Sequence, residues 1–298
     1  MEPLNLNEKT VFILGAGASK PYGLPLGTEL KQTMIANISI NACRESLQEA
    51  GFHPSLINDF HEALPRTSHP TIDIFLEKKK KFRELGAYLI AYSLFPLEDP
   101  DRLFPKKNWY GYLYEAINFE SEEPKAENIV FVTLNYDRSL EHFLSRNIHY
   151  DCADDFIQFA ESKVNSLEII HAHGSLGKYP EIPYEIKNRE HELIQSAAEK
   201  IRIASDKLED SSDFHAAQQA IKRAINIVFV GFGYDPTTLK LLVADVDVSK
   251  TRIIGTSFQL DDSRTDFVLK YFNNNIEMFH DTVDASNGLK TILSSKNT

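Results

Sequence analysis

Cysteine is scarce in this 298-residue sequence. Its only two cysteines, Cys43 and Cys152, lie far apart and belong to no C-x-x-C pair. A zinc module with four cysteine ligands is therefore excluded, and no disulfide framework is expected, which fits a reducing, cytoplasmic setting. The first residues also lack the basic-then-apolar order of a signal peptide, which agrees with that expectation.

Long apolar runs and an excess of positive charge are also missing. No apolar stretch approaches the roughly 20 residues that span a bilayer, so no membrane association is expected. The chain carries 32 basic and 43 acidic residues, a net charge of −11, which argues against broad, phosphate-driven binding of nucleic acid. The basic run 78–81 is interpreted mainly as a solvated face, with a patch for a partner or nucleic acid as the alternative.

A strand followed by a glycine turn stands near the start. Residues 11–14 are continuously apolar, as in a strand buried on both faces of a parallel sheet. The turn after it consists of small residues that let backbone N–H groups approach a phosphate: Gly15, Ala16, Gly17, Ala18 and Ser19. Because Lys20 stands where the dinucleotide fingerprint has its third glycine, an ordinary tight turn remains an alternative.

The rest of the chain alternates between helical and strand patterns. Helices are predicted over 28–64, from about 71 to 92, near 109–117, over 138–144, within 185–224 and from Pro236; strands are predicted at 129–134, 167–172, 225–230, 251–256 and 276–279. This alternation predicts an α/β, Rossmann-like, doubly wound parallel sheet with a large helical insertion after the first strand. We assign residues 1–27 and 126–298 to the core, 28–125 to the helical insertion and 179–224 to a second helical segment.

Chemically suggestive residues follow several of these strands. Ligands of such sheets bind outside the carboxyl ends of the strands, so residues at different strand ends are expected to meet. Besides the first glycine turn, the candidates are Asn135, Asp137, His173, Gly231, Gly233 and Asp235. Asp137 and Asp235 are also expected to cap the helices that follow them.

Four ordered motifs carry a family resemblance. They are Gly-Ala-Gly-Ala-Ser at 15–19, Thr-Leu-Asn-Tyr-Asp at 133–137, His-Gly-Ser-Leu at 173–176 and Gly-Phe-Gly-Tyr-Asp at 231–235. Together they resemble the sirtuin-like (silent information regulator two-like) family, in its zinc-less prokaryotic branch that cleaves NAD in defence against phage. The resemblance covers the sheet core and leaves the helical segments without a specific motif.

The resemblance implies a role for each matching residue. The NAD-phosphate loop would be Gly15, Ala16, Gly17 and Ser19. Asn135 and Asp137 would hold the nicotinamide riboside and assist glycosidic cleavage, and His173 would be the catalytic histidine. The adenosine half would lie at Gly231 and Gly233, with Gly255 at the adenine end; the segment 255–257 is a second candidate for that turn.

These residue types suit cleavage of an N-glycosidic bond. An uncharged amide such as Asn135 can hold a ribose hydroxyl or a water without repelling a developing cation, and the Asp137 carboxylate can stabilise that cation. His173 can accept a proton near neutral pH. The alternatives are turn chemistry for Asn135 and Asp137, a structural role for His173, and a metal pair of His171 and His173, which lacks an acidic or cysteine ligand at suitable spacing.

The function that follows is an NAD glycohydrolase whose products are ADP-ribose and nicotinamide. Because such an enzyme would drain its host's NAD, we expect control by homo-oligomerisation, by the helical segments or by a separately encoded partner such as a HerA-like motor ATPase. No metal is expected. The alternatives are a non-catalytic module that binds NAD or ADP-ribose and an NAD-dependent protein deacylase. The latter is disfavoured because residues 23–28 lack the Asp-Phe-Arg of the deacylases.

Overall fold

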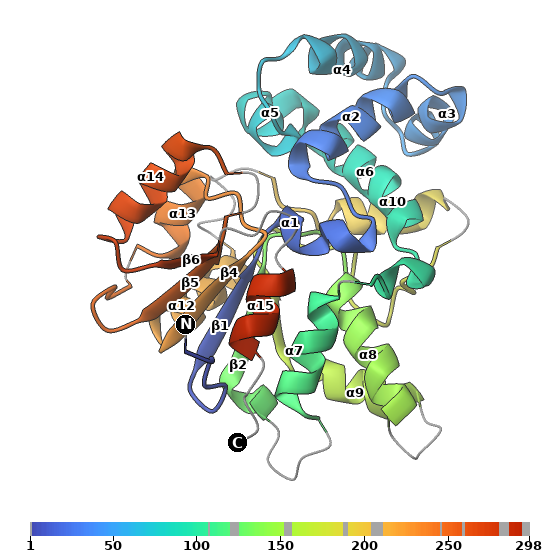
Figure 1. Cartoon of the computed structure of the whole chain (residues 1–298). Helices are drawn as coiled ribbons and strands as arrows, with labels where there is room; N and C mark the ends of the chain where they lie inside the picture. Colours follow the sequence, from blue (N-terminus) through green and yellow to red (C-terminus); the bar gives the residue numbers. More distant parts are fainter. Residues whose placement is uncertain are drawn as a thin grey trace.

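A six-stranded, all-parallel sheet forms the centre of the molecule, and helices cover both of its faces (Figure 1). This computed structural model describes residues 2–106, 108–119, 125–151, 157–186, 190–203, 211–244, 246–257, 260–279 and 286–293. The strands are β1 (Thr10–Leu14), β2 (Ile129–Thr133), β3 (Glu168–His171), β4 (Asn226–Val230), β5 (Arg252–Thr256) and β6 (Glu277–Phe279), in the spatial order β3-β2-β1-β4-β5-β6. The predicted doubly wound, Rossmann-like α/β fold is therefore confirmed.

The central strands are apolar throughout because both of their faces are covered. Every residue of β1 is buried, and Phe12 lies opposite Phe131 of β2 and Val228 of β4. Successive side chains point to opposite faces, so Phe12 and Leu14 enter one core while Val11 and Ile13 enter the other.

Two helical layers complete these cores. On the face of Phe12 lie α7 (Trp109–Ile117), α8 (Ser139–Asp151), α9 (Ile157–Asn165) and α15 (Ser286–Leu293). On the opposite face lie α12 (Ser212–Lys222), α13 (Pro236–Leu242) and α14 (Asp262–Tyr271).

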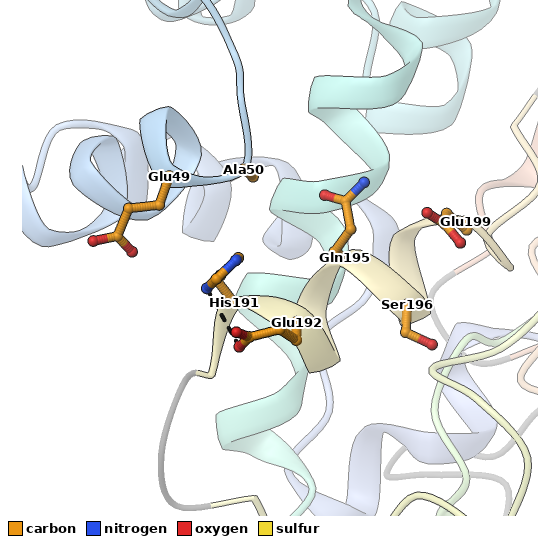
Figure 2. A pocket seen from close by; sticks show the side chains of 7 residues that line it. All are labelled: Glu49, Ala50, His191, Glu192, Gln195, Ser196 and Glu199. Carbon is orange, nitrogen blue, oxygen red and sulfur yellow. Dashed lines mark ion pairs between the residues drawn. The ribbon is translucent and has the colours of Figure 1, made fainter.

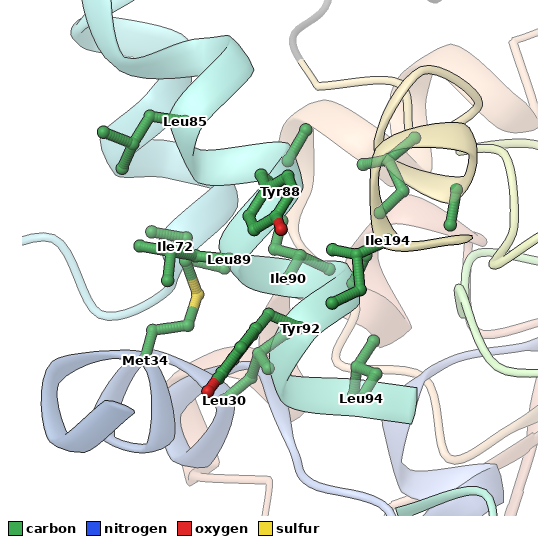
Figure 3. Packing of buried hydrophobic residues seen from close by; sticks show 14 of the residues in the cluster. Leu30, Met34, Ile72, Leu85, Tyr88, Leu89, Ile90, Tyr92, Leu94 and Ile194 are labelled. Atoms are coloured by element: carbon green, nitrogen blue, oxygen red, sulfur yellow. The ribbon is translucent and has the colours of Figure 1, made fainter. Parts of the chain in front are cut away.

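The helical insertion has a core of its own beside the carboxyl edge of the sheet (Figures 1 and 3). It contains α2 (Gly27–Ile38), α3 (Asn41–Glu49), α4 (Pro54–Arg66), α5 (Ile72–Lys78) and α6 (Arg83–Leu94). Residues 85–94 of α6 are all buried, as expected of a helix enclosed by others. Figure 3 shows Met34 of α2 and Ile72 of α5 beside α6, and Ile194 of α10 (His191–Ala198) against it.

The structure divides two of the predicted helices. The helical stretch 28–64 forms α2, α3 and α4, and Gly51 leaves the helical region with a φ of 89°. The helix expected over 71–92 is interrupted at the lysine run, where Lys80–Phe82 forms a 3-10 turn between α5 and α6.

Other predicted boundaries were also incomplete. Helix α8 extends to Asp151, and the short helix α1 (Ala16–Ser19), α9, α14 and α15 were not predicted. The helical segment predicted within 185–224 contains α10 and α12, and residues 204–210 between these two helices lie outside the described residues.

Candidate functional site

A cavity of about 580 Å³ opens at the carboxyl ends of β1 and β4. The chain leaves β1 toward β2 on one side, whereas β4 begins the other half of the sheet, so this is the topological switch point where such folds bind ligands. Its volume falls within the roughly 300–1,000 Å³ of small-molecule sites. The lining residues are Ala16, Gly17, Lys20, Pro21, Leu26, Gly27, Thr28, Glu29, Thr71, Gly231, Phe232, Gly233, Thr256, Leu260, Asp261 and Arg264.

The two glycine turns of the site touch each other through their backbones. The Gly15 amide donates to the Val230 carbonyl (3.0 Å), and the Gly17 amide donates to the Gly231 carbonyl (2.9 Å). A methyl group on Gly231 would lie 2.0 Å from the Ala18 nitrogen, and its φ of 57° favours glycine. These glycines therefore allow two turns to meet, and the Gly15 and Gly17 amides are engaged between the turns.

Two cations and two carboxylates contribute to the cavity wall. The Lys20 ammonium lies 2.6 Å from both carboxylate oxygens of Glu29, and this hydrogen bond is the main reason why the pKa of Glu29 is lowered. Arg264 of α14 donates to the Tyr234 carbonyl (2.8 Å), and Asp261 accepts from the Arg264 amide (2.7 Å). Sequence reasoning missed Arg264 because no motif surrounds it, whereas Lys20 directly follows the first glycine motif.

Asn135 and Asp137 lie behind the first glycine turn and are absent from the cavity lining. The Asn135 amide donates to the Gly15 carbonyl and to Ser19 Oγ, both at 3.0 Å. Asp137 Oδ1 accepts from Ser19 Oγ (3.2 Å), from the Ser139 amide (3.1 Å) and from the Ser139 hydroxyl. Burial raises the pKa of Asp137, and these hydrogen bonds oppose the rise. The two predicted residues thus meet Ser19 in one buried network.

His173 lies in the turn after β3, with its Nε2 atom buried and without a hydrogen-bond partner among the described residues. Burial lowers its pKa, and the charge of Asp73 opposes that change. Its ring centroid lies 6.5 Å from that of Tyr136.

His171 has different partners. Its Nε2 lies 2.7 Å from Glu141, and its Nδ1 lies 3.0 Å from the Asn135 carbonyl. Burial lowers the pKa of His171, but the Glu141 charge and both hydrogen bonds raise it more, so its pKa is raised overall. Within the described ranges, no three His, Cys, Asp or Glu side chains are arranged to hold a metal ion.

The loop after β2 is anchored to the helical insertion at two points that the sequence did not reveal. The Tyr136 hydroxyl donates to Asp73 of α5 (2.7 Å). Arg138, fully buried, forms an ion pair with Glu98, which is also fully buried, and donates to the Ile182 carbonyl (2.6 Å). Burial raises the pKa of Glu98 to about 7, and Arg138 opposes that rise. Such pairs join distant segments and leave no local sequence pattern.

The remaining predicted residues lie around the second glycine turn. Asp235 is exposed and caps α13 by accepting from the Thr237 and Thr238 amides (3.0 Å each), which confirms the predicted cap. Gly255 is outside the cavity lining, and a methyl group there would lie 2.1 Å from the Tyr234 hydroxyl. Its neighbour Thr256 does line the cavity and accepts from the Gly231 amide (2.9 Å). Segments 231–233 and 255–257 therefore both contribute residues to the cavity wall.

A second hollow, of about 350 Å³, lies between α3 and α10 (Figure 2). It is lined by Glu49, Ala50, His191, Glu192, Gln195, Ser196 and Glu199. Its acidic lining contains none of the predicted site residues.

Among the described helices, none has the length and apolar character required to cross a membrane. No protein-family model matches the chain, and no curated protein is significantly similar to it.

Proposed function

We propose that this chain is an NAD glycohydrolase, which converts NAD and water into ADP-ribose and nicotinamide. The observation that carries the proposal is the cavity at the topological switch point, where two glycine turns meet and two cations contribute to the wall. Dinucleotides are typical ligands of this position in Rossmann-like sheets. The four motifs that resemble the sirtuin-like family suggest the reaction, and they lie at the carboxyl ends of β1, β2, β3 and β4.

The pyrophosphate would bind between Lys20 and Arg264. Both side chains belong to the cavity wall: Lys20 directly follows the first glycine turn, and Arg264 donates to the Tyr234 carbonyl in the second. Arginine and lysine are the usual side-chain donors to phosphate oxygens. In the structure Lys20 is paired with Glu29, so a phosphate would compete with that carboxylate for the ammonium.

Bond cleavage would use Asn135 and Asp137 behind the first glycine turn and His173 in the turn after β3, three residues that do not line the cavity in this structure. Water attacks C1′ of the ribose, the glycosidic electron pair moves to the nicotinamide nitrogen, and the proton of the water passes to His173. Asn135 would orient the ribose or the water, and Asp137 would stabilise positive charge on the sugar. Asn135 and Asp137 are hydrogen-bonded to Ser19, so these hydrogen bonds must break before the two side chains can contact the substrate. In this proposal the hydrogen-bonded arrangement around Ser19 would be the resting state of a regulated enzyme.

We further propose a role in antiphage defence by NAD depletion, with control through homo-oligomerisation or a HerA-like motor ATPase. These points rest on the family resemblance. The physical reason for control is that unrestrained hydrolysis would consume the NAD of the host.

A second candidate is a non-catalytic module that binds NAD or ADP-ribose. One observation favours it. The side chains of Asn135 and Asp137 both form hydrogen bonds with the Ser19 hydroxyl and do not line the cavity. In this alternative the cavity binds a ligand and no bond is broken.

Nicotinamide release from NAD distinguishes the two candidates. Wild type, Asn135→Ala and His173→Ala are compared alone and with candidate partners, with His215→Ala, an exposed histidine of α12, as the matched control. The hydrolase is supported if wild type and His215→Ala release nicotinamide and if the rate of release is lower by about 10²-fold or more in both Asn135→Ala and His173→Ala. If calorimetry shows NAD binding but no nicotinamide is released under any activating condition, the binding module is supported and the hydrolase is refuted.

A further inference from the structure

The helical insertion delivers a carboxylate to the loop that carries Asn135 and Asp137. Helix α5 begins at Ile72, directly after Thr71 in the cavity wall, and its Asp73 accepts a hydrogen bond from the Tyr136 hydroxyl (2.7 Å). Tyr136 is buried and stands between the two predicted site residues. Burial, then the Asp73 charge, raises the pKa of Tyr136 well above its usual value, so the hydroxyl keeps its proton and is the donor. This bond therefore fixes the loop to the insertion.

His173 lies beside the same contact. Its ring is 6.5 Å from that of Tyr136, and its buried Nε2 lacks a partner among the residues described. Burial disfavours the protonated imidazole, so a neighbouring anion has a large effect on whether this nitrogen can accept a proton. Asp73, which accepts from the Tyr136 hydroxyl beside this ring, is such an anion, and its charge raises the pKa of His173 against the effect of burial.

Among the residues that the structure describes, Tyr136 and Arg202 are further polar neighbours of His173, and neither is an anion. Tyr136 is neutral, as its raised pKa requires. The Arg202 amide donates to the His173 carbonyl (2.9 Å), while the Arg202 guanidinium lies 3.5 Å from Asp213.

We propose that Asp73 is a positioning residue of the NAD-cleaving site, which holds the Asn135–Asp137 loop through Tyr136 and stabilises the imidazolium that His173 forms. The inference rests on the proposed function. In the reaction, the C1′–oxygen bond forms as the C1′–nitrogen bond breaks, and nicotinamide leaves with the electron pair. The water proton passes to His173 Nε2 and then to solvent. The insertion is thereby part of the site.

Two substitutions separate the charge of Asp73 from its hydrogen bond. Asp73→Asn removes the charge and keeps the shape, whereas Tyr136→Phe removes the hydroxyl and keeps the charge. Asp59→Asn is the matched control, because Asp59 is an exposed aspartate of the same insertion, 2.9 Å from Lys81. For each protein, kcat and KM are measured across pH, and the His173 titration is followed by NMR with labelled histidine, assigned with His173→Gln.

We expect Asp73→Asn to reduce kcat by about 10- to 100-fold with little change in KM. Its His173 midpoint and the acid limb of its pH profile should both move to lower pH, because the anion that favours imidazolium is gone. Tyr136→Phe should reduce kcat less and leave the His173 midpoint near that of wild type, and Asp59→Asn should behave as wild type.

An unchanged His173 midpoint in Asp73→Asn overturns the electrostatic part of the inference, and unchanged kcat in Tyr136→Phe overturns the positioning part. If Asp73→Asn does not fold, Asp73→Glu and Asp73→Ala are compared. Asp73→Glu retains the charge and should keep most of the kcat, whereas Asp73→Ala should lose it. An equal loss of kcat in Asp73→Glu and Asp73→Ala overturns the inference. Failure of the proposed function is a separate result. Wild type that releases no nicotinamide under every activating condition refutes the hydrolase and with it the catalytic role of Asp73, while the NMR titration still decides whether Asp73 acts on His173.

Discussion

Replacing Gly231 by alanine tests whether the two glycine turns must touch at backbone distance. The added methyl group would lie 2.0 Å from the Ala18 nitrogen and 2.2 Å from the Gly17 carbonyl carbon. Both are backbone atoms, so no side chain can move aside to make room. The turn at Gly231 also has a φ of 57°, which L-residues adopt at a cost.

The structure allows the two contributions to be separated. Gly51→Ala tests the positive φ alone, because a methyl group there has no described atom within 4 Å. We expect this variant to lose about 1–2 kcal/mol of unfolding free energy. Alanine at Gly233, in the same turn as Gly231, meets neither a described neighbour within 4 Å nor a positive φ, and should stay within about 0.5 kcal/mol of wild type. Gly231→Ala adds about 1–3 kcal/mol of overpacking to the φ cost, so about 2–5 kcal/mol in all.

The free energies of unfolding of the three variants are measured by urea titration with far-ultraviolet circular dichroism. NAD binding is measured by calorimetry on the same samples. Gly231→Ala should be the least stable and should lose binding, because the turns that form the cavity wall are forced apart. A Gly231→Ala protein no less stable than Gly51→Ala would refute the reasoning, since the clash would then cost nothing.

Three further predictions concern charged groups. Burial lowers the pKa of His142 to about 4, so between pH 6.5 and 4 the unfolded chain takes up a proton that the native state refuses, and stability falls by about 2–3 kcal/mol as pH drops; His142→Phe should flatten urea midpoints measured across that window, and an unchanged slope would contradict this. Glu98→Ala leaves Arg138 charged and unpaired in the interior, which should cost about 3–5 kcal/mol of unfolding free energy, with Arg138→Met in the same chain restoring much of it; equal stability of the single and double variants would argue against the pair. Lys20→Ala should weaken NAD binding about 10- to 100-fold by calorimetry, whereas Glu29→Gln, which frees Lys20 from its ion pair, should strengthen it; unchanged binding in Lys20→Ala would show that Lys20 does not meet the phosphates.

The sequence alone was sufficient for the sheet and for the sheet edge at which the cavity lies. Strands β1, β2 and β4 are buried on both faces, and this requires continuous apolar runs that stand out in any sequence. Short polar and glycine motifs directly after such runs must lie at the carboxyl edge. The meeting of Ser19, Asn135 and Asp137 follows from that rule.

What each residue touches was decided by the tertiary structure. The pattern at Gly15 and Gly17 suggested amides open to a phosphate, whereas the folded chain uses these two amides to join two turns. Asp73, which lies 63 positions before Tyr136, reaches it only because the insertion folds back over the sheet edge. Local patterns encode burial and periodicity, which depend on neighbours in sequence, while these contacts depend on how separately formed layers pack.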